Sequence, residues 1–140
     1  MHAPAWEHLE HQADIGVRGY GRTVEEAFEQ AALALIAVIT PPDKVRPVEA
    51  VALRCQAPDL EVLLVDWLSA ILCAMSERGV LFGRFAVQIR GETLEGTAWG
   101  EPVDRARHQP VVEVKAATYA GLKVQRQADG TWTAQCIVDV

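Results

Sequence analysis

Hydrophobic residues recur along this chain with two different periods. In two long segments the period is near 3.6 residues, as in an amphipathic helix, and in most other segments it is two residues, as in a half-buried strand. From Val24 to Ile39, apolar residues recur at helical spacing and form one wide stripe. Thr23 precedes this segment and Glu26 follows three residues later, which is the pattern of a capping box. The segment ends before Pro41, because proline cannot continue the helical hydrogen-bond ladder. The sequence therefore predicts an amphipathic helix over this range.

A second helical segment begins after Asp59, a favourable N-cap residue, and runs to about Arg78, with Gly79 as its stop. Apolar residues cover most of its circumference, which is typical of a central, buried helix. Asp66 and Ser69 interrupt the apolar surface, and we expect them to mark the exposed side of the helix.

The remaining segments show the two-residue alternation of half-buried strands. Gly91-Glu92 and Asp129-Gly130 separate pairs of alternating runs, and both positions predict hairpin turns. The predicted strands lie near residues 14–21, 47–56, 85–89, 94–99, 111–116, 122–124 and 132–138, and residues 6–9 can add a short one. We predict a single α+β domain over residues 1–140, with two helices packed on a mainly antiparallel sheet of about seven strands.

The overall charge is acidic, with a formal net charge of −6, and no run of lysine or arginine departs from that average. Phosphate contacts need clustered basic side chains, so we expect no stable direct binding of nucleic acid. No segment resembles a signal peptide, and charges interrupt every apolar run before it reaches the length of a membrane span. We therefore expect a cytoplasmic protein.

The three cysteines, Cys55, Cys73 and Cys136, lie far apart in apolar runs and lack the spacing of a metal or redox motif. We expect buried free thiols, as in a reducing cytosol.

Two aspartates from opposite ends of the chain are the leading candidates for a site. Asp14 begins a predicted strand on its polar face, and Asp139 lies on the polar face of the last strand, beside the carboxylate of Val140. Adjacent carboxylates repel each other, and a hard divalent cation relieves this repulsion by binding their oxygens. The residues alone also fit simpler roles, in which Asp14 caps a turn and Asp139 ends a solvated edge strand.

Other polar residues accompany these carboxylates. His11 is a candidate ligand or acid–base group, although a lone histidine is also a common structural residue. Glu113 and Lys115 share one face of a predicted strand, either as a surface ion pair or as an acid and a base at the edge of a site. His108, in the preceding loop, can join them there.

The glycines at 16, 19 and 21 do not have the spacing of a dinucleotide-binding loop, and we interpret them as backbone clearance near a site. The sequence contains no phosphate-binding loop, no G-x-S-x-G motif and no Cys-His nucleophile pair. These patterns do not indicate a stand-alone enzyme.

Three sequence motifs resemble, in the same order, those of the archease family. They are residues 10–16 followed by 23–28, then residues 113–119, and finally residues 138–140. The likeness extends over essentially the whole chain. Gln12 departs from the pattern, because the family usually has threonine there.

The resemblance implies a small α+β protein cofactor that assists an RtcB-type RNA ligase in tRNA splicing and RNA repair. Such a protein promotes GTP-dependent guanylylation of the ligase and its multiple turnover. The resemblance also implies a divalent metal, at a calcium-type oxygen-ligand site, held by Asp14, Asp139 and Val140. It assigns a part in ligase activation to Lys115.

Two other functional classes compete with this interpretation. A general protein-interaction module or chaperone would use the acidic end of the chain as a docking patch, where charge matters and metal geometry does not. A metal-dependent hydrolase acting alone lacks an activated nucleophile or base in this sequence.

Overall fold

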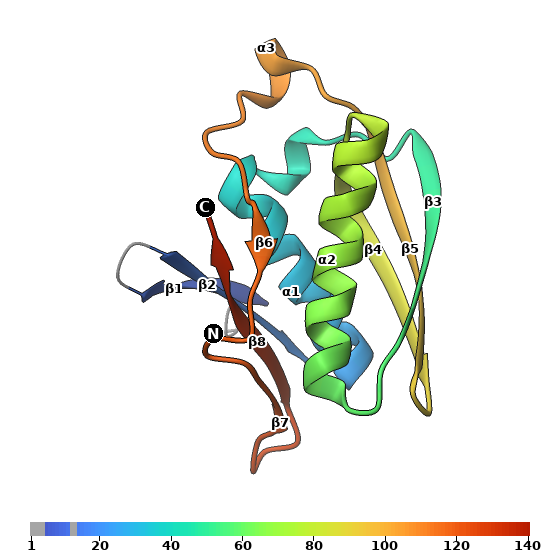
Figure 1. Ribbon diagram of the computed structural model, residues 1–140, viewed down its shortest axis with the longest axis vertical. Helices are drawn as coiled ribbons and strands as arrows, with labels where there is room; N and C mark the ends of the chain where they lie inside the picture. The colour runs from blue at the N-terminus through green and yellow to red at the C-terminus, as the bar shows by residue number, and fades with distance from the viewer. Residues whose placement is uncertain (1–4, 12–13) are drawn as a thin grey trace.

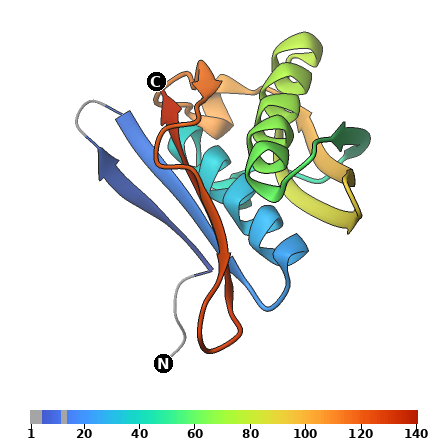
Figure 2. The same ribbon diagram turned by 60° about the horizontal axis from the view of Figure 1, so that its bottom comes forward.

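A computed structural model describes residues 5–11 and 14–140, in which a layer of helices lies between two β-sheets (Figure 1; Figure 2). The strands are β1 (Trp6–His11), β2 (Asp14–Gly21), β3 (Glu49–Gln56), β4 (Val80–Arg90), β5 (Thr93–Pro102), β6 (Ala116–Ala117), β7 (Lys123–Arg126) and β8 (Trp132–Asp139). The helices are α1 (Val24–Ile39), α2 (Leu60–Arg78) and α3 (Arg105–His108), with a 3₁₀ helix η1 (Pro42–Lys44).

The strands of the described residues pair antiparallel in a five-stranded and a three-stranded sheet. The five-stranded sheet has the order β1-β2-β8-β6, with β7 also paired to β8, and the three-stranded sheet has the order β3-β5-β4. The α+β class is confirmed, but the strands form two sheets where we predicted one. Helix α1 packs on strands of both sheets, and so does α2, because their apolar surfaces are too wide for one sheet to cover.

Helix α1 begins and ends where the sequence predicts. The Thr23 hydroxyl accepts a hydrogen bond from the Glu26 amide at 3.1 Å, and Thr40 follows the last helical residue. A Cβ atom on Gly19 of β2 would lie 2.2 Å from backbone atoms of Ala27 and Ala31. This glycine therefore lets α1 approach the backbone of β2. We had interpreted Gly19 as backbone clearance near a site, but it serves the packing of the helix.

Helix α2 is also confirmed, with Asp59 accepting a hydrogen bond from the Val62 amide at 2.8 Å. Gly79 ends it with φ of 65°, in the left-handed region. Its central residue Trp67 is fully buried and donates a hydrogen bond to the Phe28 carbonyl of α1 at 3.2 Å. This bond joins the two helices inside the core.

The exposed side of α2 lies where the sequence predicts. Asp66 and Ser69 are partly exposed, and Cys73, which shares their helix face at the spacing of i, i+3 and i+7, is exposed. The expectation of three buried thiols is therefore wrong for Cys73 and confirmed for Cys55 and Cys136.

Both predicted hairpins are present, with Gly91 and Gly130 at positive φ in the turns between β4 and β5 and between β7 and β8. The predicted strand over 111–116 is largely wrong. Only Ala116–Ala117 pairs with β8 as a strand, because the start of the segment bonds elsewhere, with the Val111 amide donating to the Ile39 carbonyl at 2.9 Å. Within residues 5–11 and 14–140, no helix is both long and apolar enough to cross a membrane.

Candidate metal and partner-binding site

Strand pairing brings Asp14 and Asp139 to the same end of the five-stranded sheet. Strands β2 and β8 are antiparallel, with Ile15 opposite Val138, so the next position outward holds Asp14 on one strand and Asp139 on the other. Opposite residues of an antiparallel pair project from the same face. Ile15 and Val138 pack in the core, so both aspartates lie on the outer face, as predicted. We call Asp14, Asp139 and Val140 the acidic tip.

The acidic tip offers oxygen atoms to a ligand. Asp139 is exposed and Asp14 is partly exposed. The Val140 side chain packs against the core, which holds its main chain beside Asp139. Among the described residues, neither aspartate side chain makes a hydrogen bond or an ion pair. Free carboxylate and main-chain oxygens are the donors that a hard divalent cation prefers, so this donor set fits such an ion.

The acidic tip has fewer ligand side chains than a complete metal site needs. In the part of the chain that the structure describes, no group of three or more His, Cys, Asp or Glu side chains is placed to hold a metal ion. Two aspartates therefore need further oxygens, from Val140, from water or from a partner, to complete a coordination shell.

Lys115 lies directly beside the acidic tip. Its amide donates a hydrogen bond to the Asp139 carbonyl at 2.8 Å, and the next residue, Ala116, pairs with Asp139 in the sheet. The Lys115 side chain is exposed, so its ammonium group is available to a partner that approaches the tip.

The other predicted site residues are placed differently. Glu113 is exposed but lies outside any strand, so the shared strand face with Lys115 is not formed, and the described residues contain no ion pair between them. His11 pairs in register with Asp14 at the end of β1, but its side chain lies outside the described part, as do Gln12 and Ala13. A role for His11 stays a prediction.

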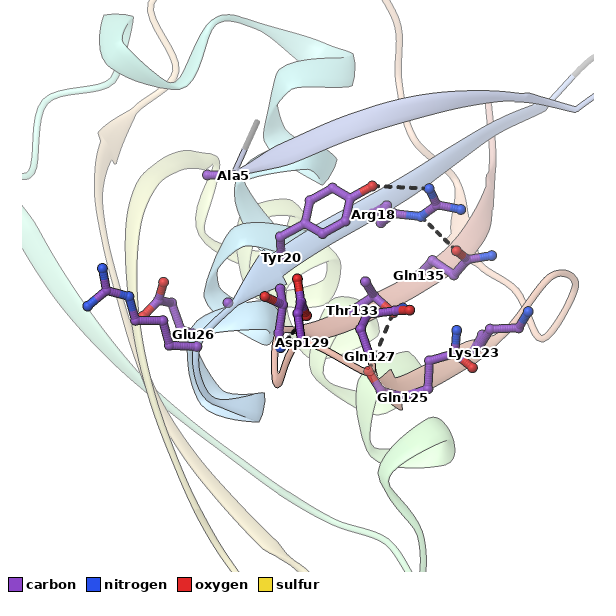
Figure 3. Close-up of a pocket in the computed structure, with 13 residues that line it drawn as sticks. Ala5, Arg18, Tyr20, Glu26, Lys123, Gln125, Gln127, Asp129, Thr133 and Gln135 are labelled. Carbon is purple, nitrogen blue, oxygen red and sulfur yellow. Dashed lines mark hydrogen bonds between the residues drawn. The ribbon is translucent and has the colours of Figure 1, made fainter. Parts of the chain in front are cut away.

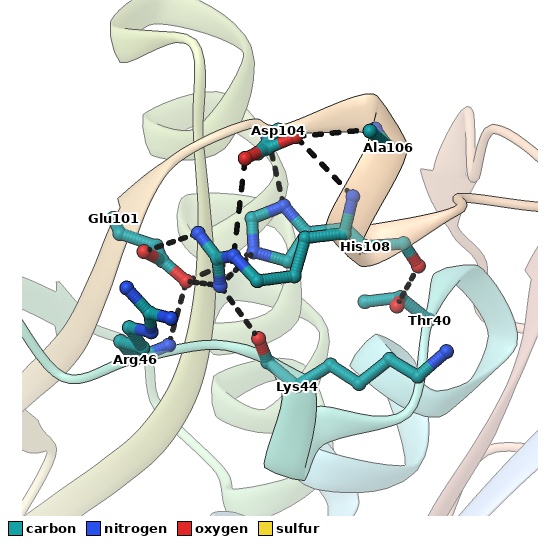
Figure 4. Close-up of polar contacts among 8 residues, drawn as sticks. Thr40, Lys44, Arg46, Glu101, Asp104, Ala106 and His108 are labelled. Carbon is teal, nitrogen blue, oxygen red and sulfur yellow. Dashed lines mark hydrogen bonds and ion pairs between the residues drawn. The ribbon is translucent and has the colours of Figure 1, made fainter.

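His108 is not available at the edge of the site, contrary to our expectation, because its side chain is fully buried in another cluster (Figure 4). Its Nδ1 accepts a hydrogen bond from the Asp104 amide at 2.9 Å, so the proton is on Nε2, which donates to Glu101 Oε2 at 2.9 Å. The Thr40 hydroxyl donates to the His108 carbonyl at 2.6 Å. His108 thus holds α3 against the end of α1.

Glu101 is the centre of this buried cluster. Arg107 donates from both terminal nitrogens to the Glu101 carboxylate, at 2.6 and 2.8 Å, and the Arg46 amide donates to it at 2.8 Å. The hydrogen bonds from Arg107 hold the pKa of Glu101 well below its ordinary value. No sequence pattern indicated this cluster, in which Asp104 caps α3 by accepting hydrogen bonds from the Ala106 and Arg107 amides.

A depression of about 700 Å³ lies farther along the outer face of the five-stranded sheet (Figure 3). Arg18 lies at its edge and donates to Gln135 at 2.8 Å and to Glu7 at 2.9 Å, with its guanidinium 5.9 Å from the Tyr20 ring centre. These bonds pair the Arg18 guanidinium with neighbouring protein groups. No sequence pattern assigned Arg18 a role.

Comparison with known proteins agrees with this architecture. Residues 6–140 match the sequence model of the Archease protein family (MTH1598/TM1083). Protein archease of Pyrococcus furiosus is 44% identical over 139 residues, which cover 96% of this chain and 98% of that protein. Protein archease of Aeropyrum pernix is 37% identical over 145 residues, which cover 100% of both chains.

Two solved structures share the fold. The solution structure of Methanobacterium thermoautotrophicum protein 1598 superposes with a TM-score of 0.85 at 33% identity, over 97% of this chain and 99% of that one. The crystal structure of a Thermotoga maritima archease, described as a possible chaperone, gives a TM-score of 0.62 at 20% identity, over 100% and 98% of the chains. By its sequence match along nearly its whole length, this chain belongs to the archease family.

Proposed function

We propose that this protein activates an RtcB-type RNA ligase in the cytoplasm, promoting GTP-dependent guanylylation and multiple turnover of the ligase in tRNA splicing and RNA repair. Family membership supports an accessory protein, and the acidic tip supports a site that acts on a partner. The observation that carries the proposal is the meeting of Asp14 and Asp139, from opposite ends of the chain, at one exposed sheet end.

In this proposal Asp14, Asp139 and the main-chain oxygens of Val140 would hold a divalent metal ion of calcium type. When bound, such an ion supplies positive charge to phosphate oxygens during nucleotidyl transfer. The two aspartates orient their oxygens toward the ligase from one sheet face. Lys115 brings a mobile positive charge that contacts a phosphate or an acidic group of the ligase.

The supporting structure makes the tip rigid. Strand β8 lies between β2 on one side and β6 on the other, so Asp139 is fixed by hydrogen bonds across the sheet. The Thr118 hydroxyl adds a hydrogen bond to the Ile137 carbonyl at 2.7 Å. A rigid tip presents its oxygens without an entropic cost of ordering, which favours binding at a partner's active site.

A general interaction module or chaperone is the second candidate. Exposed Val103, Val111 and Val112 line a groove of about 550 Å³ beside the end of α2, and exposed apolar side chains of this kind favour protein contacts. The Thermotoga maritima archease of similar fold is described as a possible chaperone. In such a protein the tip acts through charge alone.

The discriminating experiment measures ligase guanylylation with GTP and metal, with and without this protein. We expect Asp139→Asn to lose stimulation, because it keeps the side-chain shape but removes the charge and metal affinity of the carboxylate. Asp43→Asn, at an exposed position of η1, is the matched control and should stimulate like the wild type. A loss no greater than that caused by Glu113→Gln, which removes an exposed carboxylate outside the tip, would favour the interaction module, in which charge matters and metal geometry does not.

A further inference from the structure

The outer face of the three-stranded sheet carries three arginines that have no protein partner. Arg54 lies on β3, and Arg84 and Arg90 lie on β4, all exposed and all on the face turned away from the helices. Within residues 5–11 and 14–140, none of their side chains makes an ion pair or a hydrogen bond. We call this outer face of β3, β5 and β4 the arginine face.

Positive charge is concentrated here although the whole chain is acidic. Among the described residues of this face, Glu95 is the one exposed carboxylate, and it lies on β5 between Arg54 and Gln88. Three guanidinium groups therefore face one carboxylate, on a chain whose formal net charge is −6. No run of basic residues predicts this surface, because the arginines are gathered by strand pairing and not by sequence proximity.

The middle of the arginine face is flat and open. Three small residues pair side by side across the three strands: Ala52, Thr97 and Ala86. Their short side chains leave the backbone of the sheet close to the surface. Two shallow depressions of about 560 and 220 Å³ lie over this part of the face. Planar groups can therefore approach the sheet between the arginines.

An aromatic side chain borders this open area. Trp99 lies on β5 between Ala50 and Arg84, on the outer face and partly exposed, whereas its neighbours Ala98 and Gly100 are buried. Residues on one strand face are about 7 Å apart, so Trp99 and Glu95 span about 14 Å along the sheet with Thr97 between them. An aromatic ring at one end of a low platform offers a stacking surface for a planar base.

We propose that, contrary to the expectation from the net charge, the arginine face binds single-stranded nucleic acid, with Trp99 stacking on a base and Arg54, Arg84 and Arg90 contacting phosphates. Stacking on aromatic rings combined with basic side chains along the backbone is the general mode of single-strand binding. An acidic protein segment would satisfy the arginines but would leave the ring and the open platform without a function. This proposal goes beyond ligase activation and does not depend on the ligase.

Fluorescence anisotropy of a short labelled oligouridine, titrated with the protein alone, tests the proposal. We expect Arg54→Ala and Arg84→Ala each to weaken binding, and Trp99→Ala to weaken it about fivefold or more. Three phosphate contacts predict a slope of about −2 in a plot of log binding constant against log salt concentration. Glu95→Gln should tighten binding by removing the repelling charge, and oligothymidine should bind by the same contacts.

The matched control is Arg22→Ala, an exposed arginine outside the arginine face, which should bind like the wild type. The proposal is overturned if the Arg54, Arg84 and Trp99 variants bind as the wild type does, or if Arg22→Ala weakens binding equally. Binding of a labelled poly-glutamate peptide of equal charge that is as tight as that of oligouridine, and is unaffected by Trp99→Ala, would also overturn it in favour of an acidic protein partner. The assay contains no ligase, so either outcome leaves the activation proposal to its own test.

Discussion

Two groups of charged residues in this protein differ in how their charges are balanced. Glu101 is buried and receives hydrogen bonds from Arg107 and His108, so its charge is used inside the fold. Asp14 and Asp139 lie side by side on an outer face, and among the described residues no basic side chain forms an ion pair with them. Unbalanced carboxylates of this kind are more informative about function than the larger, satisfied cluster.

The Glu101 cluster predicts a specific dependence of stability on pH. The pKa of Glu101 lies well below its ordinary value of 4.5, so the unfolded chain binds a proton more readily than the folded one. Its contribution to the free energy of unfolding is therefore complete above about pH 5 and is lost as the pH falls toward the folded pKa. Urea unfolding at a series of pH values should show less acid sensitivity, and lower stability near neutral pH, in Glu101→Gln. An unchanged pH profile in this variant would contradict the assignment.

Lys115 predicts a separation between stability and activation. Its side chain is exposed, so Lys115→Met should leave the urea-unfolding midpoint nearly unchanged. Ligase guanylylation should nevertheless fall about tenfold or more, because a charge-assisted contact contributes about 1.5–3 kcal/mol. Lys115→Arg keeps the charge and should retain part of the activity. If the Met variant stimulates like the wild type, Lys115 takes no part in activation.

At the scale of elements, local signals predicted helices better than sheets. The boundaries of α1 and α2 follow from caps at Thr23, Asp59 and Gly79, which act within one helical turn. The division of strands into two sheets depends on which face of each helix a strand covers, and that is a tertiary choice. The segment before β6 alternates like a strand but bonds to the end of α1, and so the alternation misled the prediction there.

The close approach of α1 to β2 predicts a large effect at Gly19. Any Cβ atom there would overlap backbone atoms of Ala27 and Ala31, which cannot rotate away as side chains do. Gly19→Ala should lower the free energy of unfolding by about 3 kcal/mol or more, through forced separation of the helix and strand. Gly91→Ala is the control, because its turn position has positive φ but open space, and it should cost only about 1 kcal/mol. Equal losses in the two variants, measured by urea unfolding, would refute this packing account.

At the scale of the whole molecule, the two sheets lie on opposite sides of the helical layer (Figure 2), and each carries one of the two proposed sites. The acidic tip lies on the outer face of the five-stranded sheet, and the arginine face is the outer surface of the three-stranded one. A protein built in this way can contact two chemically different partners at once. Reading the sequence identified the tip but not the arginine face, because only strand pairing gathers those arginines.

The prediction of the tip depended on two kinds of information. Strand alternation placed Asp14 and Asp139 on polar faces, and the structure shows that they meet. The choice between a metal ligand and a solvated strand end came from the archease resemblance, since isolated aspartates do not specify a ligand. Binding of a metal there stays a prediction.

Ligase guanylylation by GTP, with this protein or its Asp139→Ala variant, tests the central claim most directly. Stimulation by the wild type, and its loss in a variant with unchanged stability, is the result that an active acidic tip predicts. Equal stimulation by the two proteins would contradict it, because the tip would then contribute nothing to activation. Circular dichroism and urea unfolding of both proteins should accompany the assay, so that a folding defect is not mistaken for loss of the site.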